Sequence, residues 1–162
     1  MKEYLNTNFI VKSAIVAALY TVLTLLVPVA SFGPIQFRFS EIMVLLVFYN
    51  KRFIPGLVLG CFIANLFSPM VLFDITFGTL SSYIAFTLMK RSKTLFMASL
   101  WPVLMVIVPA LGTYFILSND AVLIFMIFEF MASEFVMVSI IGVILFNILE
   151  KNQGFMSYIR NF

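Results

Sequence analysis

Histidine is absent from this sequence, and cysteine occurs only once, at Cys61. The lack of histidine removes a common metal ligand and the side chain that most readily exchanges a proton near neutral pH. A single cysteine cannot form an internal disulfide framework. We therefore expect no metal site and no cofactor in this protein.

Charged residues are also scarce, because only 10% of the chain is Asp, Glu, Lys or Arg, against 63% apolar residues. Soluble domains usually carry about 25% charged residues. The mean hydropathy is +1.12, and a water-soluble fold of this size has too little interior to hide so much apolar surface. The net charge of +3 is spread over short turns, so it does not indicate nucleic-acid binding. The composition predicts an integral membrane protein.

Sequence motifs for energy coupling and catalysis are missing as well. There is no glycine-rich ATP loop, no dinucleotide fingerprint, no His-Glu-x-x-His zinc helix and no Gly-x-Ser-x-Gly elbow. The second half does not repeat the first, as it does in many secondary transporters. We expect that the protein is not an enzyme and that any uphill transport is driven by another subunit.

Six apolar runs alternate with short polar segments, and they predict an all-α membrane protein with six transmembrane helices. A helix needs ~20 residues to cross ~30 Å of hydrocarbon, so the second run is too short to span alone. The runs extend over Phe9 to Pro28, Ile42 to Tyr49, Gly56 to Phe67, Val71 to Met89, Leu95 to Leu117 and Ala121 to Leu149. Turns are expected at Gly33-Pro34, Ser68-Pro69 and Ser118-Asn119-Asp120.

The segment from Ser31 to Glu41 is the most unusual part of the chain. It holds Gln36, Arg38, Ser40 and Glu41 between two apolar runs. We expect this loop to dip into the outer half of the membrane, ahead of the short second helix. Non-helical backbone at that depth is tolerated only beside protein or a water-filled cavity. The loop is therefore a candidate wall of a binding site.

Basic residues predict the orientation of the chain in the membrane. In a six-helix topology, nine of the ten Lys and Arg residues fall on one side, and Arg38 alone falls on the other. Basic residues accumulate on the cytoplasmic side of membrane proteins. Both termini are thus expected in the cytoplasm, with Arg38 on the outer side.

Four carboxylates lie within or at the edges of the apolar runs, at Glu41, Asp74, Glu129 and Glu134. A charge at the bilayer centre costs ~2.5–3.5 kcal/mol on insertion scales, so such residues are usually functional or paired. One interpretation is purely structural, with Arg38 neutralising Glu41. It leaves three acids without a cation at their depth, so we favour a cavity that binds a cationic or donor-rich ligand, with Glu41 as the resting partner of Arg38.

The third and fourth runs carry small or polar residues at helical spacing. In the third run, Gly56, Gly60 and Ala64 form a ridge that lets helix backbones approach, and we interpret it as packing. The adjacent Asn65 fits packing and ligand binding about equally well. In the fourth run one polar face is shared by Asp74, Gly78, Ser81, Ser82 and Ala85.

Three blocks of sequence occur in a recognisable order. They are Phe32-Gly-Pro-Ile-Gln-Phe-Arg-Phe-Ser-Glu41, Gly60-Cys-Phe-Ile-Ala-Asn-Leu66 with Ser68, and Asp74-Ile-Thr-Phe-Gly-Thr79. In order and spacing they resemble the queuosine-precursor transporter family, often called QueT. Members of that family commonly carry a Gly-Glu pair in the last helix. Here Ser133-Glu134 retains the acid without the glycine.

The resemblance implies a six-helix substrate-binding subunit (S component) of an energy-coupling-factor (ECF) importer, with residues 1–162 forming one transmembrane domain in the bacterial cytoplasmic membrane. Such a subunit captures a deazapurine, for example 7-aminomethyl-7-deazaguanine (preQ1), from outside. It docks on a membrane scaffold subunit that carries two cytoplasmic ATPases. The family's docking contact falls on Ala14 and Ala18, for which internal packing is an equally strong interpretation.

A guanine-like ligand accounts for the polar residues gathered above. One carboxylate, of Glu134 or Glu129, accepts the adjacent N–H donors of the ring, a second acid meets the ammonium, and Gln36 or Arg38 donates to the carbonyl. The aromatic candidates for stacking on the ring are Phe37, Phe39 and Phe77. The full set of candidate ligand-binding residues is Gln36, Arg38, Glu41, Asn65, Asp74, Glu129 and Glu134.

A second hypothesis is a self-sufficient proton-coupled carrier of a small cationic or heterocyclic solute. In that case Glu129, Glu134 and Asp74 would relay protons. The absence of histidine and of an inverted repeat argues against it.

Overall fold

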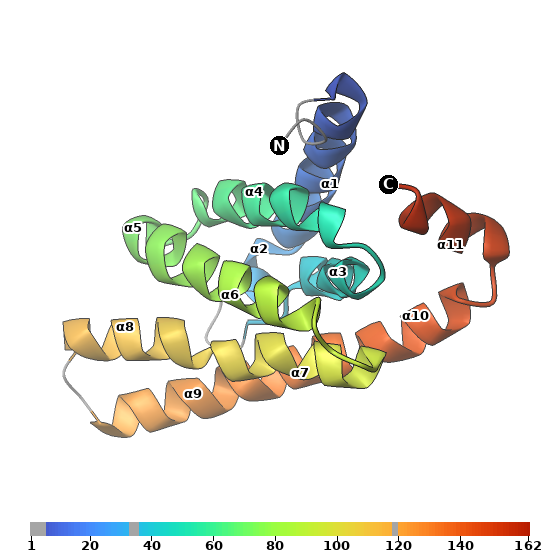
Figure 1. The fold of residues 1–162 in the computed structure, drawn as a ribbon. Helices are drawn as coiled ribbons and strands as arrows, with labels where there is room; N and C mark the ends of the chain where they lie inside the picture. The colour runs from blue at the N-terminus through green and yellow to red at the C-terminus, as the bar shows by residue number, and fades with distance from the viewer. Residues whose placement is uncertain (1–5, 33–35, 118–119) are drawn as a thin grey trace.

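A computed structural model describes residues 6–32, 36–117 and 120–162, and all regular structure within these ranges is helical (Figure 1). Among the described residues, four helices are long and apolar enough to cross a membrane: Thr7–Leu25, Val71–Met89, Leu95–Gly112 and Leu123–Leu149. The predicted all-helical class is confirmed. The count of six crossings, the orientation and the depth of the polar loop stay predictions. The turns expected at Gly33-Pro34 and Ser118-Asn119 lie outside the described residues.

The first long helix packs tightly against the helix formed by Ile54–Asn65. The helix α1 (Thr7–Leu25) begins after Asn6, whose side-chain oxygen accepts a 3.1 Å hydrogen bond from the Asn8 N–H. In α4 (Ile54–Asn65), a Cβ atom added at Gly60 would lie 2.8 Å from the Tyr20 Cβ on α1. Only a residue without a side chain permits this approach. The interpretation of the glycine ridge as helix packing is confirmed.

The polar loop leads into the short second helix earlier than the sequence predicts. The helix α1 ends at Leu25, and Pro28 opens α2 (Pro28–Phe32), in the first turn where proline needs no N–H partner. After the loop, a 3₁₀ helix (Phe39–Leu45) continues into α3 (Leu46–Tyr49). The predicted start at Ile42 is therefore three residues late, because the polar Ser40 and Glu41 already belong to the first helical turn.

Two of the long helices contain a stretch of wider π-helix, which the hydropathy pattern does not predict. One helix runs through α5 (Val71–Phe73), a π segment (Asp74–Gly78) and α6 (Thr79–Met89). The other runs through α9 (Asp120–Glu134), a π segment (Phe135–Gly142) and α10 (Val143–Leu149). Such bulges often occur at functional sites. Here Asp74 and Glu134 stand at the starts of the two bulges.

Proline divides the predicted fifth helix into α7 (Leu95–Met105) and α8 (Ile107–Leu117). Pro109 has no N–H to donate to the carbonyl four residues earlier, at Met105. The hydroxyl of Ser81 on α6 donates to that carbonyl oxygen at 2.6 Å. The neighbouring helix thus satisfies a backbone group that the break exposes.

A short amphipathic helix, α11 (Gln153–Arg160), follows the last long helix and is absent from the sequence-based prediction. It begins at Asn152, whose side chain accepts a 3.1 Å hydrogen bond from the Phe155 N–H, and it buries Met156 and Ile159. The Asn50 amide donates to the Ile159 carbonyl at 3.1 Å. The chain therefore turns back at its end, so that α11 lies near α1 and α3 (Figure 1).

A packed apolar core occupies the middle of the bundle. It includes Leu45, Leu57, Met89 and Val138, none of which has measurable exposed surface. The outside is apolar as well, and Leu72 is 82% exposed in the isolated chain. Large apolar side chains on the outer surface are suited to lipid as the surrounding medium.

Candidate functional site

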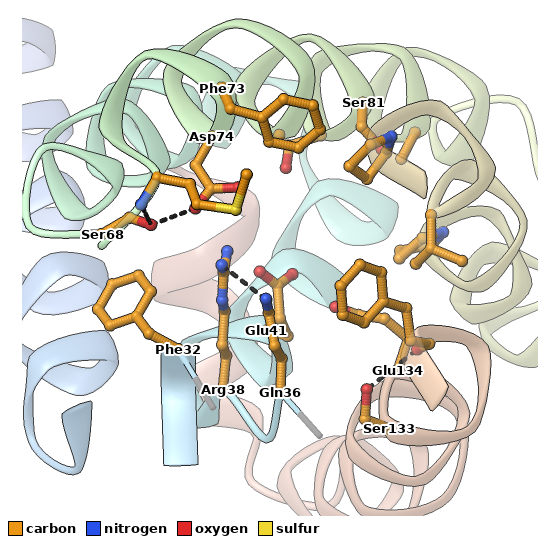
Figure 2. A pocket seen from close by; sticks show the side chains of 18 of the residues that line it. Phe32, Gln36, Arg38, Glu41, Ser68, Phe73, Asp74, Ser81, Ser133 and Glu134 are labelled. Atoms are coloured by element: carbon orange, nitrogen blue, oxygen red, sulfur yellow. Dashed lines mark hydrogen bonds between the residues drawn. The ribbon is translucent and has the colours of Figure 1, made fainter. Parts of the chain in front are cut away.

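One cavity of about 220 Å³ borders the packed core, because Ala85 and Phe86 belong to both. Figure 2 shows the cavity from close by. Glu41 precedes core residue Leu45 by four positions, and Glu134 likewise precedes Val138. The cavity is bordered by the polar loop, the segment 68–86, α7, α8 and α9. Its walls are formed by Phe32, Gln36, Arg38, Glu41, Ser68, Pro69, Met70, Phe73, Asp74, Gly78, Ser81, Ser82, Ala85, Phe86, Pro102, Val106, Pro109, Met126, Phe130, Ser133 and Glu134.

Arg38 rises from the loop into the cavity beside Gln36 (Figure 2). Its Nη2 donates to the Gln36 Oε1 at 2.8 Å, and its Nε donates to the Ser31 carbonyl at 3.1 Å. The guanidinium also lies 5.4 Å from the centre of the Phe32 ring, within range of a cation–π contact. These two hydrogen bonds and the ring contact fix the position of Arg38, which is the only basic side chain among the described residues of the cavity wall.

Glu41 is buried in the cavity wall and accepts a hydrogen bond from the Tyr20 hydroxyl of α1. Among the described residues, the structure gives Arg38 and Glu41 different hydrogen-bond partners. The opposite charges of Arg38 and Glu41 nevertheless attract each other, and Glu41 as the resting partner of Arg38 stays a prediction. The loop folds so that the guanidinium reaches Gln36, two residues away, while the 3₁₀ turn directs Glu41 toward α1.

A group of buried hydroxyls holds the loop against α1 behind Glu41. The Ser31 hydroxyl donates to the Thr24 carbonyl at 2.6 Å, and the Thr24 and Ser40 hydroxyl oxygens are 2.7 Å apart. All three side chains are fully buried. Buried hydroxyls need such partners, so these contacts fix both ends of the loop that carries Arg38.

Asp74 lies on the opposite wall, at the start of the first π segment (Figure 2). Its carboxylate accepts a hydrogen bond from the Ser68 hydroxyl, which in turn accepts from the Met70 N–H at 3.1 Å. The turn between α4 and α5 is thereby tied to the carboxylate. The predicted polar face of this helix is also found, because Gly78, Ser81, Ser82 and Ala85 line the same cavity.

Asn65 is fully buried behind the wall and does not line the cavity. Its amide nitrogen donates to the Asp74 carbonyl at 2.8 Å and lies 3.3 Å from the Thr79 hydroxyl. A π segment breaks the regular α-helical ladder, so this backbone carbonyl gains a side-chain donor. The position of Asn65 supports the backbone of Asp74, and direct contact of Asn65 with a ligand stays a prediction.

Glu134 enters the cavity from the end of α9, next to Ser133. Its Oε2 atom is buried, and no hydrogen-bond partner contacts it in the part of the chain that the structure describes. A buried polar group without a partner costs ~1–3 kcal/mol, more if charged. Of the lining carboxylates, this one has the clearest unused capacity for a ligand.

Glu129 is half-buried on α9 and lies outside the cavity wall. Five of the seven predicted ligand-binding residues therefore share the cavity: Gln36, Arg38, Glu41, Asp74 and Glu134. The aromatic candidates Phe37, Phe39 and Phe77 are not among the lining residues. The rings that do line the cavity belong to Phe32, Phe73, Phe86 and Phe130.

The lining aromatic residues were missed because they do not differ from other phenylalanines in a sequence that contains 20. Ser133 was noticed only through its neighbour Glu134. Met126 and Pro102 gave no separate signal, since both sit in continuous apolar runs. The sequence shows which helix each of these residues belongs to, but it does not show which of them are rotated toward the cavity.

The described part of the cavity wall combines three carboxylates with one guanidinium in an apolar surrounding. If all four are ionised, the wall carries an excess of two negative charges, which favours a ligand with positive charge or several N–H donors. An all-helical bundle with an apolar exterior and a polar cavity defines a membrane protein suited to binding a small polar solute.

Residues 10–151 match the family model of the QueT transporter, and the chain belongs to this family. A relative from Lactococcus lactis subsp. cremoris (strain MG1363), named queuosine precursor transporter QueT, is 42% identical over 85 residues. The matched stretch is 51% of this chain and 50% of the relative, so the chain spans about half the length of the curated relative it matches. No solved structure matches. The predicted family is confirmed, and it is a family of transporters and not of enzymes.

Proposed function

We propose that this protein is the substrate-binding subunit of an ATP-driven ECF-type importer and that it captures a queuosine precursor. Membership of the QueT family supports transport, and the relative's name supports this class of solute. The observation that carries the proposal is a cavity lined by Glu41, Asp74 and Glu134, in which one Glu134 carboxylate oxygen has no partner among the described residues.

The chemistry of a 7-deazaguanine such as preQ1 matches these groups. Its ring presents two adjacent N–H donors, which one carboxylate accepts as a pair of parallel hydrogen bonds. Glu134 has the free oxygen for this role. The aminomethyl ammonium then pairs with Asp74 or Glu41, and Arg38 donates to the ring carbonyl. Phe130 or Phe73 covers the ring face, in place of the three aromatic residues first considered.

The size of the cavity agrees with a bicyclic ligand. An engineered protein cavity of ~150 Å³ accepts benzene, and the present cavity of about 220 Å³ is larger. It is too small for a macromolecular segment with ordered secondary structure. A small heterocycle with polar edges is therefore the class of ligand that suits both the volume and the wall.

The remaining parts of the importer follow from the same proposal. A membrane scaffold subunit with two cytoplasmic ATPases supplies the energy, and the protein lies in the bacterial cytoplasmic membrane with both termini inside. Ala14 and Ala18 are exposed on α1, on a different face from the buried Ser13 and Ala17 that pack near α4. This exposure favours contact with a partner over internal packing for the two alanines.

Ligand binding by purified variants tests the cavity. Replacing Glu134→Gln substitutes an amide donor for an acceptor oxygen, and we expect preQ1 affinity to fall by at least ~10-fold, since hydrogen bonds to charged groups contribute ~1.5–3 kcal/mol. Glu41→Gln should weaken binding less, because Tyr20 already occupies one of its oxygens. Isothermal titration calorimetry measures both, with the exposed Glu150→Gln as the matched control. Unchanged affinity in both cavity variants would falsify the assignment.

A second candidate, the proton-coupled carrier, is favoured by the same unpartnered oxygen of Glu134, since a carrier needs a carboxyl group that gains and loses a proton. Reconstitution separates the two functions. Under our proposal, liposomes containing this chain alone show no preQ1 uptake on a pH gradient, and uptake requires the ATPase-bearing partners. Uptake by the isolated chain on a pH gradient would favour the carrier.

A further inference from the structure

A second concavity, here called the apolar groove, lies between α1, the helix Phe39–Tyr49, α10 and the C-terminal segment. Its volume is about 590 Å³, more than twice that of the polar cavity. It is lined on α1 by Lys12, Ile15, Val16, Leu19 and Leu23, and directly after α1 by Leu26. The groove shares none of its lining residues with the polar cavity, so the proposed solute does not account for it.

The residues that line the groove follow one side of the chain from Lys12 on α1 to Leu26. From Lys12 to Leu26 the helix rises about 21 Å, at ~1.5 Å per residue. That length exceeds the ~15 Å depth of one leaflet's hydrocarbon, half of a ~30 Å core. A chain of methylene groups that enters at one end and lies along α1 therefore fits the groove from the interface inward.

Charge distinguishes one end of the groove from the rest. Lys12 is the only charged side chain among the residues that line it, all of which the structure describes. Its ammonium lies 5.5 Å from the ring centres of both Tyr158 and Phe162 and donates to the Asn161 carbonyl at 3.4 Å. An ammonium has three N–H donors, so two remain for an anionic group at this end.

The C-terminal helix α11 borders the end of the groove near Lys12. The C-terminal helix α11 is amphipathic, with Met156 and Ile159 buried against the bundle and Arg160 exposed. The Asn50 amide donates to the Ile159 and Arg160 carbonyls, each at 3.1 Å. Amphipathic helices of this kind lie at the membrane interface, where basic side chains meet lipid phosphates.

We propose that the apolar groove is a binding site for an anionic phospholipid. One acyl chain lies along α1 between Leu19 and Leu145, and the phosphate lies at Lys12 beside α11. The surrounding membrane supplies this ligand, and its two chemical parts match the two parts of the groove. The exposed Ala14 and Ala18 point to the neighbouring face of α1 and are left free for a protein partner. This inference does not depend on the identity of the transported solute.

Native mass spectrometry of the full chain, titrated with phosphatidylglycerol or with phosphatidylcholine of the same acyl chains, tests the charged end. We expect about fivefold tighter binding of phosphatidylglycerol, the effect of one basic residue at a membrane surface. Lys12→Ala should remove this preference, while Lys93→Ala, which replaces an exposed lysine in the turn before α7, should retain it. Equal binding of the two lipids by the unaltered protein, or an equal loss in both variants, overturns the proposal.

A second pair of variants tests the apolar part. Leu19→Trp fills the groove and should reduce the binding of both lipids, whereas Val22→Trp, on the exposed face of α1, should not. An unchanged circular-dichroism spectrum and an unchanged elution volume in gel filtration establish that each variant has folded. If Leu19→Trp binds lipid as tightly as Val22→Trp, the acyl chain does not occupy the groove. If Leu19→Trp does not fold, Lys12→Gln takes its place, because this change only removes the charge. Loss of the preference for phosphatidylglycerol in Lys12→Gln then supports the proposal, and an unchanged preference overturns it.

Discussion

The packed core and the polar cavity share helices and meet at Ala85 and Phe86. In the core, Leu45, Leu57 and Val138 belong to one cluster of buried apolar side chains, against which partly buried ones pack. In the cavity, charged groups are fastened by neutral neighbours, Arg38 by Gln36 and Glu41 by Tyr20. Helices in lipid gain little from apolar burial, because lipid tails are as apolar as leucine. The core therefore stabilises by close packing, while the cavity holds charge in place by hydrogen bonds.

The largest effect on folding is expected in the core. Leu57→Ala leaves a void between α4 and its neighbours, and we expect the free energy of unfolding to fall by about 2 kcal/mol. This is the low end of the ~2–5 kcal/mol range for such changes, because the transfer contribution is lost in lipid. Steric-trap or urea unfolding in detergent measures it, with Leu59→Ala, 46% exposed on the same helix, as the control. The affinity for preQ1 should stay the same. A loss of affinity without a loss of stability would contradict the separate roles of the packed core and the polar cavity.

A smaller cost is expected where the cavity meets α1. Tyr20→Phe removes the hydroxyl that donates to the buried Glu41 carboxylate. The unpaired carboxylate oxygen should lower the free energy of unfolding by about 1–2 kcal/mol. The same unfolding assay applies, with Tyr83→Phe, which is 52% exposed, as the matched control. Equal effects of the two substitutions would show that the Tyr20 contact contributes nothing.

The smallest effect is expected at the helix break. Ser81→Ala removes the donor of the 2.6 Å hydrogen bond to the Met105 carbonyl. We expect a loss of about 1 kcal/mol, the usual net contribution of one hydrogen bond. Thr87→Ala serves as control, because its hydroxyl donates to the Tyr83 carbonyl on its own helix and is exposed. If Ser81→Ala unfolds no more readily than this control, the break at α7 does not need a donor from α6.

Much of the fold could be predicted from the sequence, because hydropathy reports where helices begin and end in a membrane protein. The runs Val71 to Met89 and Leu95 to Leu117 agree with the structure at both ends. The π segments were not predicted, since a single extra residue in a helical turn leaves the hydropathy of the run unchanged. The helix α11 was missed because its eight residues mix polar and aromatic side chains in a short segment.

The candidate site was predicted less completely than the fold. Acids in apolar runs are conspicuous, so Glu41, Asp74 and Glu134 were found and do share one cavity. Hydrogen-bond partners depend on three-dimensional distances, so the sequence did not predict the hydrogen bond from Arg38 to Gln36, although the charge of Glu41 does attract the guanidinium. Asn65 shows the same difficulty, because a buried amide that supports a backbone carbonyl looks in sequence like one that contacts a ligand.

The position of Asn65 has a consequence for how this protein can change over evolutionary time. The side chain that satisfies the Asp74 carbonyl lies behind the cavity wall and does not contact the cavity itself. Substitution of a cavity-facing side chain such as Met70 therefore leaves this backbone contact in place, whereas Ser68 and Ser81 line the cavity and also make structural hydrogen bonds. A new solute preference can thus arise more readily at some wall positions than at others, and the placement of Asn65 is one reason for the difference.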